Sequence, residues 1–201
     1  AASALQTALG AGLALAVLGP ALASDLGRET LDRWSAPYRG WTYHADHVIP
    51  AEPKIPGHEA FKNTDVPCVY QLPGAPELWY MSFIACDGHG YNSFVAESRD
   101  LVRWTRPRLA LGFGPEGAFD HGGRVLGAYL YESADIAAPR VLKKRDGRFW
   151  SLYGAYPRQG GYELRPGYEG VAVSDDGLVW RRALDEPVLA VQDPDCEAWE
   201  R

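Results

Sequence analysis

The chain has 201 residues, a formal net charge of −6 at pH 7 and a composition that is 46% hydrophobic and 12% aromatic. The negative charge excludes the broad basic surface that nucleic-acid-binding proteins need, since basic residues cluster only at Lys143, Lys144 and Arg145. With 22 glycines and 15 prolines, the composition is typical of many short strands joined by turns. We therefore expect an all-β fold and no nucleic-acid partner.

Residues 1–23 predict a signal peptide. They contain no charged residue, are rich in Ala and Leu, and end in Ala21-Leu22-Ala23, the pattern of a cleavage site. Gly10, Gly12 and Pro20 interrupt the apolar run, which argues against a membrane span. We expect a secreted or periplasmic protein, not attached to the membrane after cleavage. Because the sequence has no initiating Met and stops at Arg201, we also expect it to be part of a longer protein.

Residues 24–64 predict a leader segment rather than a domain of their own. The stretch 47–57 contains three prolines, which favour an extended and irregular backbone. Such a segment could lie across a face of the domain that follows.

One motif occurs twice in the remaining residues, 65–201. Segments 95–104 and 171–180 share the pattern V-A-x-S-x-D, followed by an apolar residue and then Trp104 or Trp180. Val and Ala favour strands, Ser and Asp bond their own backbone in turns, and Trp is a large apolar anchor. A β-prone segment after a turn precedes each copy, at 78–83 and 148–153, and a short β-prone run at 68–70 and 141–142 precedes each turn as the first strand of its unit. We predict two units of three or four antiparallel strands, each with its Trp buried, as in the blades of a β-propeller.

The cysteines predict neither a disulfide framework nor a metal site. A turn at 73–76 would place Cys68 opposite Ser82, so Cys68 is out of register with Cys86. The spacing of these two with Cys196 fits no zinc motif. We expect no metal and no other cofactor.

Acidic residues recur where the units begin. Asp65 opens the first unit and Glu200 the start of a third. In a propeller the first strand of each blade lies innermost, so such acids would face one central pocket. For the second unit, Asp135 lies 14 residues before an aromatic strand residue, as Asp65 does, whereas Asp120 directly follows an aromatic residue, as Glu200 does. Both Asp120 and Asp135 remain candidates.

The repeated motif, the Asp-x-Pro opening at 65–67 and the Asp-Gly hairpin at 146–147 resemble the five-bladed β-propeller glycosidases. This superfamily includes the family 43 arabinanases and xylosidases and the family 32 and 68 fructosidases. The resemblance covers residues 65–201 and implies about two blades and the start of a third, in a catalytic domain truncated at its C-terminus. The Asn-Asp-Pro-Asn-Gly and Arg-Asp-Pro motifs of family 32 are absent, so the resemblance does not extend to one activity or sugar.

The resemblance also implies roles for the acids. Asp65 would be the general base or nucleophile, and Glu200 would be the general acid. Asp135 (or Asp120) would orient the general acid and tune its pKa. Glycoside hydrolysis needs this equipment, because one carboxylic acid protonates the leaving oxygen while a carboxylate activates water or attacks carbon. Other residues expected to bind the carbohydrate are Asp120, His121 and Arg140, with Trp41, Tyr91, Tyr129, Tyr156 and Trp199 as aromatics that could stack on sugar rings.

Two other functions remain open. In a phosphorylase of the related mannoside type, phosphate would replace water, and this would require basic residues near the acids. The candidates are Arg124, Arg140 and His121. In a non-catalytic, sugar-binding propeller the acids would be structural, and fold alone does not exclude this.

Overall fold

The computed structural model describes residues 27–36, 48–49, 53–135, 138–162 and 164–196. The chain separates into two units, 1–45 and 46–201. In the first, α2 (Arg28–Ser35) begins after Gly27 and carries an i,i+4 ion pair between Arg28 and Asp32 at 3.5 Å. None of the helices within the described residues is long and apolar enough to span a membrane.

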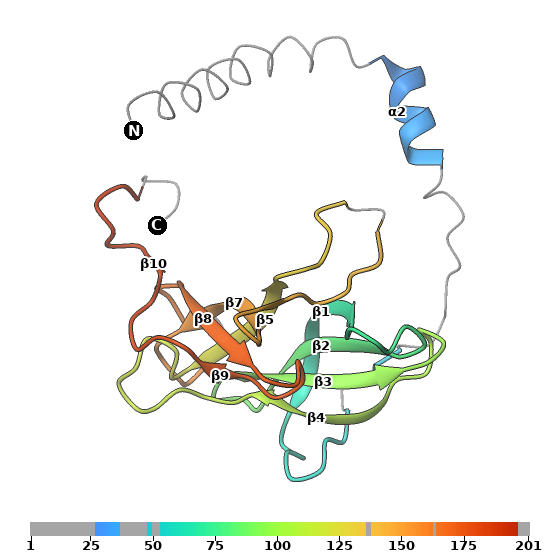
Figure 1. The fold of residues 1–201 in the computed structure, drawn as a ribbon. Coiled ribbons are helices and arrows are strands. Elements are labelled where there is room, and N and C mark those ends of the chain that lie inside the picture. Colours follow the sequence, from blue (N-terminus) through green and yellow to red (C-terminus); the bar gives the residue numbers. More distant parts are fainter. Residues whose placement is uncertain (1–26, 37–47, 50–52, 136–137, 163, 197–201) are drawn as a thin grey trace. The chain divides into compact units, whose positions relative to one another are not determined.

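The second unit begins with a four-stranded antiparallel blade whose strands follow the chain order (Figure 1). They are β1 (Lys62–Gln71), β2 (Trp79–Cys86), β3 (Tyr91–Ser98) and β4 (Thr105–Leu111). Gly74, at φ 82°, provides the left-handed residue that the first turn requires. Cys68 pairs with Ser82, as the turn position predicted, and all three cysteines are free thiols.

The second blade contains β5 (Gly123–Tyr129), β7 (Arg148–Tyr156) and β8 (Tyr168–Ser174). Short strands β9 (Arg181–Arg182) and β10 (Leu189–Ala190) pair with β8, and β6 (Lys144–Arg145) pairs with β7. Its first strand is not where the sequence predicted it. Residues 141–142 form only isolated bridges, to Gln71 and Tyr131, and β5 begins some 18 residues earlier.

Each copy of the repeated motif forms the same turn after the third strand of its blade. The Ser hydroxyl accepts a backbone N–H from three residues further on, and the Asp carboxylate accepts the next two N–H groups. The Trp indole N–H then donates to the carbonyl of the residue bonded to Ser. The residues are Ser98, Asp100, Leu101 and Trp104 in the first blade and Ser174, Asp176, Gly177 and Trp180 in the second.

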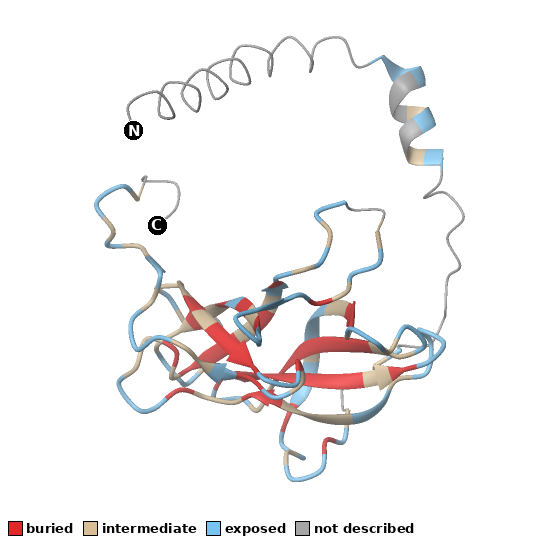
Figure 2. Ribbon diagram, viewed as in Figure 1, coloured by how far each residue is buried: buried red, intermediate tan, exposed pale blue. Residues whose placement is uncertain are grey.

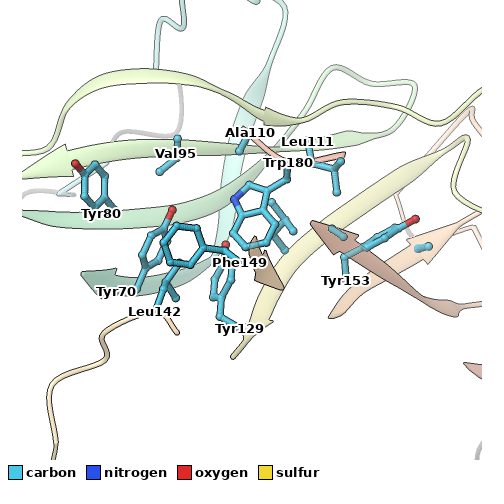
Figure 3. Close-up of a cluster of buried hydrophobic side chains, with 13 residues drawn as sticks. Tyr70, Tyr80, Val95, Ala110, Leu111, Tyr129, Leu142, Phe149, Tyr153 and Trp180 are labelled. Carbon is cyan, nitrogen blue, oxygen red and sulfur yellow. The ribbon is translucent and has the colours of Figure 1, made fainter. Parts of the chain in front are cut away.

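The main core lies between the blades and is rich in aromatic side chains (Figure 3). Tyr70 of β1 contacts Tyr129 of β5 with ring centroids 4.9 Å apart, and its hydroxyl donates to the carbonyl of Gly177 at 2.8 Å. Trp180 packs against Tyr129, so it is buried as predicted. The Ser93 hydroxyl ties β3 to β5 by donating to the Arg124 carbonyl and accepting the Leu126 N–H, both at 2.8 Å.

Residues 53–61 of the leader cover the other face of the first blade. Ile55 and Phe61 are buried there against Phe83 and Phe94. The red, buried segments of Figure 2 therefore run through the middle strands of this blade. Trp104 packs at the margin of this second cluster and is only half-buried, so the prediction that both motif tryptophans are buried is wrong for Trp104.

Candidate functional site

Strands β1, β3 and β5 run parallel and begin at one edge of the sheet, called here the starting edge. Lys62 pairs with Cys86, Cys86 with Tyr91, and Tyr91 with Gly123, which aligns the three strand starts. Residues early in β1 and residues just before β5 therefore share this edge. Residues that follow β5 lie at the opposite edge.

Asp65 lies at the starting edge, in a distorted part of β1. The pairing with β2 shifts register on both sides of Asp65, and the adjacent Val66 has φ 50°. Positive φ is rare for a β-branched residue, and such strain concentrates at functional sites. Bulges also re-aim side chains. The Asp65 carboxylate is exposed, with Oδ1 accepting the Val66 N–H at 2.7 Å.

Residues 157–162, a loop segment of the second blade, reach Asp65. The Tyr162 hydroxyl donates to Oδ2 of Asp65 at 3.3 Å, and the Tyr162 ring packs against Tyr91 with centroids 5.3 Å apart. Gly160 donates its N–H to the His89 carbonyl in the β2–β3 turn at 2.7 Å. The exposed acid of the first blade is thus bonded by an aromatic residue of the second blade, which in turn packs on the first.

Asp120 is also near the starting edge but is fully buried. Its carboxylate binds Arg124 Nη2 at 2.7 Å and Arg182 Nη1 at 3.3 Å, and accepts the Tyr153 hydroxyl at 2.6 Å. Burial first, and then the bond to Asp120, raise the pKa of Tyr153 well above 10, so the phenol keeps its proton as a donor. Asp120 has no open side for a ligand. It joins the segment before β5 to β7 and β9.

Asp135 and Arg140 lie in the connection that follows β5, at the opposite edge from Asp65. Asp135 is exposed, and Arg140 covers the Tyr131 ring at 5.0 Å while its carbonyl accepts the Gln71 N–H at 2.9 Å. The predicted equivalence of Asp135 with Asp65 is therefore wrong. It assumed that equal residue counts mean equal positions, but the connection from β5 to β7 is much longer than the one from β1 to β2.

Strand register gives the true counterpart of Asp65. Trp79 pairs with Ser98 and Phe149 with Ser174, so the two blades align residue by residue. Asp65 pairs with Ile84, and Gly154, the counterpart of Ile84, pairs with Val125. The second blade therefore has Val125 where the first has Asp65.

The remaining candidates differ in what the structure says of them. His121 follows Asp120 near the starting edge, with Nδ1 3.1 Å from the Gly114 carbonyl and its own carbonyl bonded by Gln159. Glu200, Trp199 and Trp41 lie outside the described residues. Within the described residues, no group of His, Cys, Asp or Glu is arranged to hold a metal ion.

Two residues of interest were not selected from the sequence. Tyr162 is 97 positions from Asp65 in the chain, so no local pattern links them. Glu169 is half-buried beside Gly154 and lines a pocket of about 760 Å³ together with Tyr156 and Tyr168. Burial raises the pKa of Glu169. The glycine- and tyrosine-rich composition of residues 157–169 was the available signal.

Neither a protein-family model nor a curated protein matches the sequence. Among solved structures, a protein described as a glycoside hydrolase matches over 68% of this chain, with a TM-score of 0.58 and 24% identity. The fold is that of a β-propeller. The chain spans 40% of the length of that structure. A β-1,2-mannobiose phosphorylase from Listeria innocua is similar over 64% of this chain and 33% of its own, with a TM-score of 0.45 and 20% identity. The predicted all-β propeller class, with two blades formed, is confirmed.

Proposed function

We propose that the complete protein is a glycoside hydrolase in which Asp65 acts at the reacting carbon. The observation that carries this proposal is the setting of Asp65: an exposed carboxylate on the distorted first strand of its blade, bonded by Tyr162, whose ring packs on Tyr91. The similarity to a structure described as a glycoside hydrolase supports it at the level of the fold.

The mechanism assigns different work to the acids. Asp65, which is open to solvent, is the general base or nucleophile. Glu200, at the start of the next predicted blade, is the general acid. Asp120 takes the place of Asp135 as the second acid, but acts by fixing the backbone beside His121 rather than by contacting sugar, because it is enclosed by Arg124, Arg182 and Tyr153. The separation of the Asp65 and Glu200 carboxyls then sets the stereochemistry, about 5 Å for retention and about 6.5 to 9.5 Å for inversion.

Hydrolysis is preferred to phosphorolysis because of where the basic candidates lie. Arg124 is bonded to Asp120, and Arg140 lies at the opposite edge from Asp65. Of the three, only His121 is near the starting edge, and it contacts Gly114. Within the described residues, these candidates do not form a phosphate site beside Asp65.

The test is Asp65→Asn in the complete protein, with Asp135→Asn as the matched control. We expect kcat to fall by about 100-fold or more in the first variant, since a carboxylate base typically contributes about 10² to 10⁴. Binding of an oligosaccharide by calorimetry should change little. Asp135→Asn should keep kcat within about twofold. Assays with and without inorganic phosphate separate hydrolase from phosphorylase.

Full hydrolysis by Asp65→Asn would refute the proposal. Loss of activity in Asp135→Asn alone would refute the placement of the site at the starting edge.

A further inference from the structure

We infer that Tyr162 is a positioning residue for Asp65, so that a loop of the second blade completes the site on the first. This rests on the proposed function of Asp65. It assigns a role in the same reaction to residues 157–162, which the acid pattern of the sequence does not select.

The loop is held against the first blade directly and through the segment before β5. The N–H of Gly160 donates to the His89 carbonyl of the first blade, and within the second blade the N–H of Gly122 donates to the Tyr156 carbonyl at 2.8 Å. The backbones of Gly90, Gly122 and Arg158 approach so closely that a Cβ on either glycine would collide with a neighbouring carbonyl oxygen. These contacts fix both the first residues of the loop and the turn that they cover.

Tyr162 is placed by its ring as well as by its hydroxyl. The ring packs against Tyr91, which is fully buried and belongs to β3. The hydroxyl then meets Oδ2 of Asp65 at 3.3 Å. Because the ring contact does not involve the hydroxyl, replacing Tyr162 with Phe removes one interaction and preserves the other.

The Asp65 carboxylate needs a second partner. Within the described residues, its Oδ1 accepts the N–H of the next residue, Val66, whose positive φ is itself unfavourable for a β-branched side chain. A bond from another blade to Oδ2 restricts rotation of the carboxylate and sets the direction from which it approaches the sugar. Correct orientation of a reacting group affects the chemical step more than ground-state binding.

The experiment compares Tyr162→Phe with Tyr131→Phe in the complete protein. Tyr131 lies in the connection after β5, at the opposite edge from Asp65, and its ring is covered by Arg140. We expect Tyr162→Phe to lower kcat by about fivefold to tenfold with KM within about twofold, the pattern of a misoriented catalytic group. Tyr131→Phe should leave both constants within about twofold. In the Asp65→Asn background, Tyr162→Phe should have no further effect.

The outcomes separate this inference from the function on which it rests. If Asp65→Asn is inactive while Tyr162→Phe keeps the wild-type kcat, Tyr162 has no positioning role and the proposed function stands. If Tyr162→Phe raises KM alone, Tyr162 binds substrate instead, and the inference is wrong. If Asp65→Asn is fully active, the proposed function itself fails.

Discussion

Asp120 illustrates how a carboxylate of the type used in catalysis can instead stabilise the fold. It is enclosed by two arginines and a tyrosine that come from three strands of the second blade, β5, β7 and β9. A buried charge without its partner is far more costly than an exposed one. The structure therefore predicts a large energetic effect at Asp120 and a small one at exposed ion pairs.

Asp120→Asn should lower the free energy of unfolding by about 3 to 5 kcal/mol, because the buried Arg124 would lose the charge that compensates it, while Arg182 would keep only its exposed partner Asp185. Urea unfolding measures this. The control is Asp175→Asn, whose pairs with Arg148 and Arg181 are solvent-exposed and should contribute less than about 1 kcal/mol. Equal, small losses in both variants would show that Asp120 is not an energetic centre.

At the level of single residues, the sequence identified Asp65 because a blade opens there. It could not choose between Asp120 and Asp135, since that choice depends on where β5 begins. It could not indicate Tyr162, because the contact with Asp65 joins residues 97 positions apart and forms only when the two blades pack together.

At the level of the strands, the repeated motif is a turn in which two side chains replace water as partners of the backbone. In the second copy, Asp176 Oδ1 accepts the N–H groups of Leu178 and Val179 at 2.8 and 2.9 Å. Burial raises the pKa of Asp176, but the hydrogen bonds from the N–H groups of Val179 and Leu178 outweigh this effect. The pKa of Asp176 therefore lies below the ordinary Asp value of 3.8. The ionised form of Asp176 is thus the one that the folded turn favours.

Asp176→Ala should therefore destabilise the protein by about 0.5 to 2 kcal/mol at neutral pH, as loss of a helix cap does. A lowered folded pKa means that this stability is present above the unfolded pKa and is lost as the pH falls through the folded value. Thermal unfolding from pH 7 to pH 2.5 should show the wild type and the variant converging in acid. The neighbouring Asp175→Ala is the control and should be nearly neutral at every pH, so a similar loss there would discount the role of the turn.

The first blade was predictable strand by strand because its turns are short and its strands carry Val, Tyr, Phe and Trp. In the second blade the sequence indicated β7 and β8 but not β5, because β5 contains Gly123, Arg124 and Gly127 and lacks the alternation of a typical strand. The long connection 130–147 also made the number of residues between β5 and β7 differ from the number between β1 and β2, so counting residues did not locate β5. Tertiary contacts with Ser93 and β7, rather than local preference, make residues 123–129 a strand.

At the scale of the β unit, the second blade has an uncovered apolar face. Ser82 of the first blade is buried against the second, and its counterpart Leu152 is 40% exposed. Leu152 lines a pocket of about 480 Å³ with Leu130, Trp150 and Val171. A following blade would cover this face as the second blade covers the first.

Residues 1–201 expressed alone should associate through this face, because exposed apolar patches drive self-association. Leu152→Ser introduces the residue that the first blade has at the same position, and should shift sedimentation velocity profiles toward the monomer. Val179→Ser, at an exposed turn residue outside that pocket, is the control. Unchanged association in Leu152→Ser would show that contact occurs elsewhere.

Ile55 and Phe61 of the leader pack onto the outer face of the first blade, so the described part of the β unit exposes an apolar face only on the second blade. A protein with two complementary exposed faces can add copies without limit and form fibres, whereas one with a single such face can associate only as a dimer across a twofold axis. Residues 53–61 would thus limit association to a dimer. Removing them should expose a second apolar face and allow larger, open-ended assemblies to form.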